Sequence, residues 1–247
     1  MSAERERSVT EAFVSLADSL VGPFDVVELL DVLTEECVRL LDVASAGLLL
    51  ADRSGVLHVV AASSEQTRSL ELFQLQRDEG PCLECYRTGV TVGVADLQRH
   101  ADRWPQFVPA AHEQGFVSVH ALPMRLQDQV LGALGLFGTS VGSLNDEDLS
   151  LGQALAHVAS VALVTGNATT DRARLDQQLQ NALDSRVFVE QAKGAVAQHA
   201  NVTMDEAFTL LRLYSRDHDQ RLTDVAQAVA TRRLPVQQVA GSRQSAR

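Results

Sequence analysis

Residues 118–137, SVHALPMRLQDQVLGALGLF, contain two strand-like runs with a short polar connection between them. The first run is Ser118–Leu126 and the second is Val130–Phe137, and only Gln127-Asp128-Gln129 separates them. Adjacent strands that are joined by so tight a connection pair in antiparallel fashion. This stretch therefore predicts a fold that is built on an antiparallel sheet.

Three more strand-like runs precede this pair. Ala46–Ala51 and Val56–Ala62 are separated by Asp52-Arg53-Ser54-Gly55, which has the composition of a hairpin turn. A shorter extended run covers Thr91–Val94, and the segment around Trp104-Pro105 is expected to be a loop. We expect these runs to belong to the same antiparallel sheet.

Helical patterns surround the strands. Residues 8–42 predict a helix in two pieces, broken at Gly22-Pro23, and the chain from Asn145 to about His199 predicts one near-continuous helix. A capping box, Thr203-x-x-Glu206, opens a further helix, and Pro235 stops the last one. The predicted fold class is an α+β domain with an antiparallel sheet, then a connecting helix and a small all-helical module.

Charge is unevenly distributed along the chain. The formal charge of −11 speaks by itself against nucleic-acid binding, because phosphate contacts need clustered positive charge. Residues 1–170 contain 10 basic and 23 acidic side chains, whereas the chain from Asp171 onward contains 11 basic and 9 acidic ones, a charge of +2. The C-terminal part therefore stays a candidate for nucleic-acid binding.

Composition bounds the class of protein and its location. No run in the 247 residues approaches about 18 consecutive apolar residues, so we expect no transmembrane helix. Residues 1–13 are charged and polar, which predicts no secretory signal. Three cysteines argue against a disulfide scaffold and fit a reducing cytoplasm, where we expect the protein to be located.

Motifs of the common enzyme classes are missing from the sequence, since it contains no P-loop, GxGxxG, GxSxG or HExxH pattern. The seven histidines lack metal-ligand spacing, and the carboxylate pairs Glu35-Glu36 and Glu147-Asp148 are expected to lie on solvated helical faces. We therefore expect a protein that is not an enzyme, without catalytic residues or a metal site. The residues identify no cofactor.

The CxxC run Cys82-Leu83-Glu84-Cys85 is the one feature that looks reactive. Gly80-Pro81 precedes it, which predicts that Cys82 lies near a helix N-terminus, where the pKa of a thiol is lowered. Cys82 and Cys85 are candidate redox residues, although two structural cysteines are the more common reading of such a run. Trp104 is a candidate wall of a ligand pocket, and packing of a loop onto the sheet is the alternative.

Basic side chains lie at the edge of the predicted C-terminal helices. Arg186 and Lys193 are two turns apart, so both project along the edge of an apolar stripe. Arg212 precedes Ser215, and Arg221 opens the last helix. Such a module can place donors against phosphates and base edges. A helical dimerisation module with a solvated basic rim explains the same pattern.

The C-terminal part closely resembles the ANTAR domain, a family of three-helix RNA-binding modules in bacterial transcription antiterminators. The resemblance covers Leu179 to Arg233 and rests on three runs: Ala182-Leu183-x-Ser185-Arg186 with Gln191-Ala192-Lys193-Gly194, then Asp205-Glu206-Ala207-Phe208 with Leu211-Arg212 and Ser215, then Leu222-x-Asp224-Val225-Ala226. It implies RNA contacts by Arg186, Lys193, Arg212, Ser215 and Arg221, and packing positions at Ala192, Gly194, Ala207 and Ala226. Arg221 stands where the family has lysine, which keeps the charge but changes the donor geometry.

The first 165 residues resemble a GAF domain of the kind found in actinobacterial GAF–ANTAR regulators. The resemblance rests on Glu79-Gly80-Pro81-Cys82, Val94-x-Asp96-Leu97, Arg103-Trp104-Pro105, Ser118-x-x-Ala121-Leu122-Pro123 and Leu131-Gly132-Ala133-Leu134. It implies a six-stranded antiparallel sheet that senses a small molecule or signal. The expected boundaries are a GAF-like sensor at 1–165, a helical linker at 166–178, an ANTAR domain at 179–235 and a disordered tail at 236–247.

Together the two resemblances imply a signal- or ligand-regulated antiterminator that binds paired stem-loops in nascent mRNA. A homodimer would read the two stem-loops, and the near-continuous helix would carry the signal between the domains. One alternative is a GAF-fold thiol sensor or enzyme, similar to the methionine-sulfoxide reductases on this fold, that uses Cys82 or Cys85. Another is a sensor that acts only through protein partners.

Overall fold

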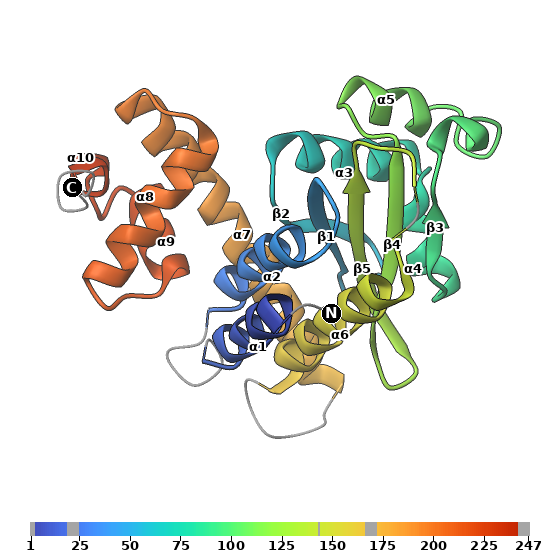
Figure 1. The fold of residues 1–247 in the computed structure, drawn as a ribbon. Helices are drawn as coiled ribbons and strands as arrows, with labels where there is room; N and C mark the ends of the chain where they lie inside the picture. The colour runs from blue at the N-terminus through green and yellow to red at the C-terminus, as the bar shows by residue number, and fades with distance from the viewer. Residues whose placement is uncertain (1–2, 19–24, 143, 166–171, 242–247) are drawn as a thin grey trace.

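The computed structural model describes residues 3–18, 25–142, 144–165 and 172–241 (Figure 1). Its sheet has the strand order β2-β1-β5-β4-β3, and every neighbouring pair is antiparallel. The strands are β1 (Ser45–Ala51), β2 (Leu57–Ala62), β3 (Val92–Val94), β4 (Ser118–Leu126) and β5 (Gln129–Gly138). The antiparallel sheet predicted from the sequence is confirmed, with all five strand-like runs in it.

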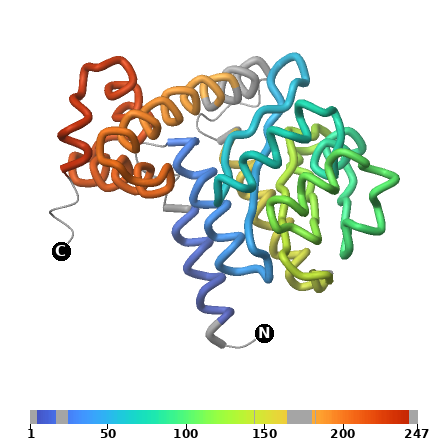
Figure 2. Tube along the Cα trace, turned by 90° about the horizontal axis from the view of Figure 1, so that it is seen from above, coloured from blue at the N-terminus to red at the C-terminus, as the bar shows by residue number. Residues whose placement is uncertain are grey.

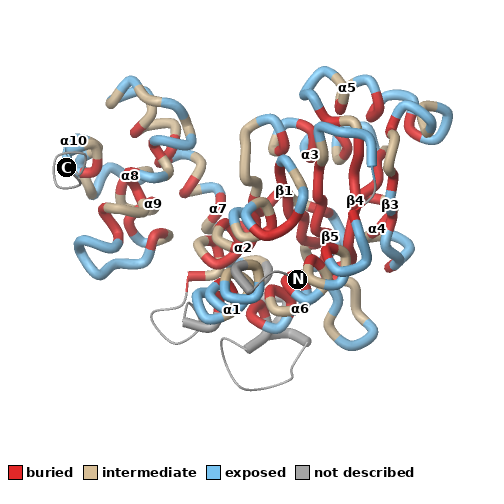
Figure 3. The backbone as a smooth tube through the Cα atoms, viewed as in Figure 1, coloured by how far each residue is buried: buried red, intermediate tan, exposed pale blue. Residues whose placement is uncertain are grey.

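Helices cover both faces of this sheet, and the residues of its central strands are therefore buried along most of their length (Figure 3). In β1, Leu48 and Leu50 belong to one core and Leu49 to the other, as the alternation of side chains along a strand requires. The first core also contains residues of α1 (Ala3–Asp18), α2 (Val26–Leu40) and α6 (Asp146–Thr165). The second core contains residues of α3 (Glu65–Arg77), α4 (Pro81–Thr88) and α5 (Phe107–Glu113). A short 3-10 helix, η1 (Leu97–His100), lies on this second side.

The C-terminal helices form a third core of their own. These helices are α7 (Arg172–Ala200), α8 (Met204–Asp217), α9 (Leu222–Ala230) and α10 (Val236–Ala240). The predicted capping box is present, since Thr203 Oγ1 accepts from the Glu206 amide and the Glu206 carboxylate accepts from the Thr203 amide. Figure 2 shows this module beside the sheet domain, with α7 leading into it.

The chain between Asn145 and His199 does not form one near-continuous helix, as the sequence had predicted. It forms α6 and α7, which contact each other, so α7 folds back toward the sheet domain. Leu183 of α7 thereby joins the first core together with Leu155 and Leu163 of α6. A straight helix would leave that apolar side chain away from this core. Residues 166–171, in the expected linker, lie outside the described residues.

Two further expectations are corrected. The resemblance to GAF domains implied six strands, whereas the sheet of the described residues has five. The tail expected to be disordered from residue 236 begins with α10, because Val239 is fully buried in the third core. Residues 242–247 lie outside the described part of the chain. None of the described helices is long and apolar enough to cross a membrane.

Candidate nucleic-acid interface

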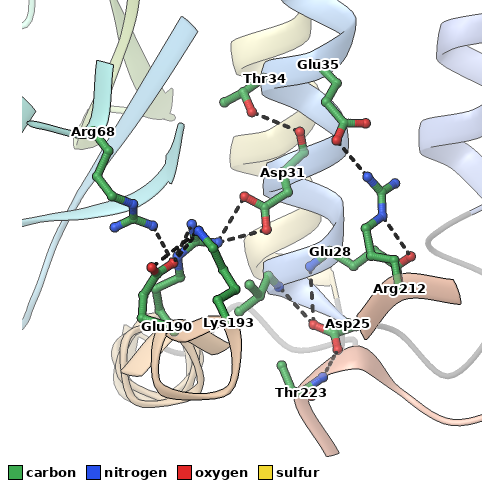
Figure 4. Close-up of polar contacts among 12 residues, drawn as sticks. Asp25, Glu28, Asp31, Thr34, Glu35, Arg68, Glu190, Lys193, Arg212 and Thr223 are labelled. Atoms are coloured by element: carbon green, nitrogen blue, oxygen red, sulfur yellow. Dashed lines mark hydrogen bonds and ion pairs between the residues drawn. The ribbon is translucent and has the colours of Figure 1, made fainter. Parts of the chain in front are cut away.

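Four cationic side chains of the C-terminal module face the sheet domain. We call them the basic face: Arg186, Lys193, Arg212 and Arg216. The first two come from α7 and the last two from α8. All four form ion pairs with carboxylates, and most of these acids belong to α2. Figure 4 shows Lys193 beside Glu190 and Arg212 beside Glu35. Sequence analysis placed Arg186 and Lys193 along the edge of an apolar stripe, and that edge is covered in the structure.

Arg186 is held by a buried ion pair. Its Nη1 donates to both carboxylate oxygens of Asp31, at 2.9 and 2.8 Å, and its Nη2 lies 3.0 Å from Glu190 Oε1. Only 7% of the Arg186 side chain is exposed. Burial raises the pKa of Asp31, and the neighbouring Arg186 acts in the opposite direction because it stabilises the carboxylate. Arg186 therefore binds an oxyanion inside the protein.

Lys193 is the only lysine of the chain, and its side chain is 6% exposed. Its Nζ lies 3.2 Å from Glu65 Oε1 of α3 and 3.3 Å from Glu190 Oε2. Glu190 also accepts a 2.6 Å hydrogen bond from Arg68 Nη2, so one carboxylate connects cations of both domains. A cavity of about 120 Å³ remains beside Lys193 and Arg186, which shows that this contact is not tightly packed.

Arg212 and Arg216 extend the contact along α2. Arg212 Nη1 donates to Glu35 Oε1 at 2.6 Å, and its Nε lies 4.0 Å from Glu28 Oε1. Arg216 Nη2 lies 3.9 Å from the same Glu28 oxygen. Glu35 keeps half of its side chain exposed, as expected for a solvated helical face, and its neighbour Glu36 pairs with Arg39 of the same helix. The same expectation is wrong for Asp148, which is buried and pairs with Arg5.

Asp25 joins the two domains at the start of α2. Its Oδ1 accepts from the Val27 and Glu28 amides at 3.0 and 3.3 Å, which caps α2. Its Oδ2 accepts from the Thr223 amide of α9 at 2.7 Å. One carboxylate thus satisfies first-turn N–H groups of two helices, one from each domain.

The two remaining predicted RNA contacts, Ser215 and Arg221, are not part of the basic face. Ser215 is buried, and its Oγ donates to the Arg212 carbonyl at 2.9 Å. Arg221 is half exposed, and its Nε and Nη2 donate to the Asp224 carboxylate at 2.8 and 2.9 Å. Of the predicted packing positions, Ala192, Ala207 and Ala226 are fully buried. Gly194 is not one, since a Cβ there would meet nothing within 4 Å.

The acidic partners were missed in the sequence, although a signal for them exists. Glu28, Asp31 and Glu35 recur at spacings of three and four, so they share one face of α2. The apolar residues Leu29 and Leu33 lie on the face that packs against the sheet. A helix with both stripes can contact two partners, and here the acidic stripe contacts the C-terminal module.

Cys82 and Cys85 lie in the second core and not in a reactive setting. Cys82 follows Pro81 at the start of α4, as predicted. Burial nevertheless raises the pKa of the Cys82 thiol far above its usual range and that of Cys85 to about 12. The dipole of so short a helix does not overcome this desolvation, and a protonated thiol is a poor nucleophile.

Trp104 is buried in the same core, where Phe107 meets its ring edge-on, and Arg103 lies 4.6 Å from its ring centroid. The tryptophan therefore packs its segment onto the sheet, which was the alternative reading. That segment is partly helical, since α5 begins at Phe107. Within the described residues, no three His, Cys, Asp or Glu side chains are grouped so that they could hold a metal ion.

Comparison with known families and structures agrees with this architecture. A GAF domain model matches residues 25–164, and an ANTAR domain model matches residues 177–229. The GAF domain of an Acinetobacter phosphoenolpyruvate-protein phosphotransferase is 13% identical with a TM-score of 0.53, over 70% of this chain and 99% of that one. That of the Coxiella burnetii phosphotransferase is also 13% identical, with a TM-score of 0.51, over 64% and 94%.

These identities are too low to say more than that the fold is shared. No curated protein matches the sequence. The GAF model alone covers more than half of the chain, and the ANTAR model covers the module that carries the basic face. The chain therefore belongs to the GAF domain family and, with an ANTAR domain as its C-terminal module, is a GAF–ANTAR protein.

Proposed function

We propose that this GAF–ANTAR protein is a signal-regulated RNA-binding regulator of transcription antitermination. Its α7–α9 module would bind paired stem-loops in nascent mRNA and so prevent a terminator hairpin from forming. The basic face carries the proposal, because Arg186, Lys193 and Arg212 already bind carboxylate oxygens at hydrogen-bond distance. Phosphate oxygens accept the same N–H groups with the same charge-assisted geometry.

Binding, and not covalent chemistry, is the proposed activity. The protein would act in the cytoplasm as a homodimer, in which two modules hold two stem-loops and gain avidity from their linkage. The GAF domain would take a small-molecule ligand that controls the module. Addition of such a ligand to the full chain would raise its melting temperature, because a ligand that binds the native state stabilises it.

RNA binding is tested by titrating the full chain with labelled tandem hexaloop hairpins at several salt concentrations. Wild type is expected to bind with an affinity that falls as salt rises, since phosphate contacts release counterions. Lys193→Ala and Arg186→Ala should each weaken binding by about tenfold or more, because each removes a cationic donor that would contact RNA.

Arg233→Ala serves as the control, because it removes an exposed arginine beyond α9 that is outside the basic face. It should bind as wild type does, apart from a small general loss of charge. Equal affinities for wild type and Lys193→Ala, or binding that ignores salt, would contradict the proposal. The module would then be a surface for protein partners.

A further inference from the structure

We propose that α2 competes with RNA for the basic face, so that the conformation described here is the closed, RNA-excluding state of the protein. This inference rests on the proposed function. The competitor is the acidic face of α2, which we define as Glu28, Asp31 and Glu35. RNA and this acidic face would bind in alternation to the same guanidinium groups.

The acidic face of α2 pairs with the three arginines of the basic face, whereas Lys193 pairs with Glu65 of α3. Asp31 binds Arg186 through both oxygens, Glu35 binds Arg212, and Glu28 lies about 4 Å from Arg212 and Arg216. The three carboxylates follow one edge of a helix, so they present a row of oxyanions to the module (Figure 4). A row of oxyanions is also what an RNA backbone presents.

Simultaneous binding is excluded by burial. Arg186 and Lys193 expose only 7% and 6% of their side chains, and the residues that cover them come from α2 and α3 of the sheet domain as well as from α7. An RNA phosphate can reach these two cations only after α7 separates from α2 and α3. The ion pairs seen here and contacts of the same cations with RNA are therefore mutually exclusive.

The contact is built so that it can open. Of the described residues in the third core, Val27 is the one that the sheet domain contributes, and the basic face itself meets the sheet domain through ion pairs. Buried ion pairs add little net stability, because desolvation offsets most of their attraction. The 120 Å³ cavity in the contact points the same way. Replacement of the α2 carboxylates by RNA phosphates on the basic face would then require little free energy.

The same helix connects this contact to the sensor. On the face opposite to its acids, α2 buries Leu29, Leu30, Leu33 and Cys37 in the first core against the sheet. A ligand-driven shift in the sheet domain would therefore move the acidic face directly. Leu183 of α7 lies in that core as well, which leaves the start of the module attached when the basic face opens.

The test compares RNA affinities of full-length variants for the tandem hairpins. The variant Glu28→Gln/Asp31→Asn/Glu35→Gln removes the competing charges and keeps side chains of similar size. It should bind RNA about tenfold or more tightly than wild type, because the closed state is no longer favoured. A cooperative thermal transition verifies that the variant is folded.

A matched control removes three exposed acids of the sheet domain that are outside the contact: Asp102→Asn/Glu113→Gln/Asp128→Asn. It changes the net charge of the chain by the same amount. If both triple variants gain affinity equally, general electrostatic attraction explains the effect and the competition is overturned. If the α2 variant gains no affinity over wild type, the competition is overturned while the proposed function stands.

Hydrogen exchange gives an independent readout in wild type. The Thr223 amide is protected by Asp25 Oδ2 in the closed state, so its exchange should become faster when RNA binds. RNA binding at full affinity with this amide still protected would overturn the inference. Absence of RNA binding by wild type and by the folded α2 variant would overturn the proposed function and the inference with it.

Discussion

Two buried carboxylates, Asp31 and Glu71, differ in their partners: the first pairs with a cation and the second meets neutral donors. Burial raises the pKa of Asp31, and its pairing with Arg186 acts against this shift. Glu71 of α3 meets only neutral donors, Cys82 Sγ at 3.5 Å and Gln74 Nε2, and burial raises its pKa to about 8. Gly47 and Gly135 leave room for this carboxyl, since a Cβ at either would lie within 2.8 Å of Glu71 Oε1. Burial therefore favours the protonated form of Glu71 at neutral pH.

Glu71→Gln should stabilise the protein at neutral and higher pH. In the folded wild type the proton is held until about pH 8, whereas the unfolded chain releases it near pH 4.5. The stability that this proton contributes is complete below pH 4.5 and is lost as pH rises to 8, by up to about 1.4 kcal/mol per pH unit. Glutamine does not titrate, so the stability of Glu71→Gln should not show this loss. Melting temperatures of both proteins from pH 5 to pH 8 measure the difference.

The exposed Glu113→Gln is the control for this titration, since its carboxyl lies in water in both states. Its melting temperature should follow that of wild type across the range. A Glu71→Gln protein with the same pH slope as wild type would show that Glu71 is not protonated in the fold.

At the scale of elements, the local ends of the helices are well determined by the chain itself. The capping box of Thr203 and Glu206 starts α8, and Ser64 Oγ accepts from the Thr67 amide at the start of α3. Such caps satisfy N–H groups that have no partner within the helix. The cap of α9 is different, because its first-turn amide at Thr223 depends on Asp25 of the other domain. α9 is therefore coupled to α2.

Thr203→Ala should destabilise the C-terminal module by about 1 kcal/mol, within a range of roughly 0.5–2, because α8 loses its N-terminal cap. The measurement is the free energy of unfolding from denaturant titration. Thr209→Ala is the matched control on the exposed side of α8, where the hydroxyl only donates to the Asp205 carbonyl of its own helix. If Thr209→Ala lowers the free energy of unfolding more than Thr203→Ala does, the role of the cap is contradicted.

At the scale of the whole molecule, the two domains have opposite charge and touch through it. The acidic sensor, with a formal charge of −13 over residues 1–170, places its acids against the cations of a +2 module. The acidic half thus does more than repel RNA from itself, because part of it would occupy the surface that RNA needs. Under the proposed competition, regulation would be a change in which oxyanion the basic face holds.

Mass measurement by sedimentation tests the proposed homodimer. The full chain is expected to show a dimer mass when it binds the tandem hairpins, because two linked modules gain avidity for two stem-loops. Val187 of α7 is 55% exposed, which leaves an apolar side chain available on that helix for a second copy. A strict monomer with and without RNA would contradict the dimer, although one module could still bind one hairpin.

Most of the elements could be predicted from the sequence, since their causes are local. The five strand-like runs and the Thr203 cap depend on near neighbours in the chain. The expected stop at Pro235 is wrong, since α9 ends at Ala230 and Pro235 is the N-cap of α10. The RNA-contact residues, by contrast, were chosen from the helical pattern and a family resemblance, and their contact with RNA stays a prediction. Gly194 shows the limit of that reasoning, because its expected packing partner is not there.

The sequence by itself determined an acidic α+β sensor that is followed by a basic three-helix module. Only the tertiary structure decided that α7 folds back and that Arg186 and Lys193 are closed off by Asp31 and Glu65. The partners are 155 and 128 residues apart in the chain, and an ion pair between such distant residues leaves no local pattern. These ion pairs form only when the two domains meet, and the side chains along the whole contact decide how the domains are placed.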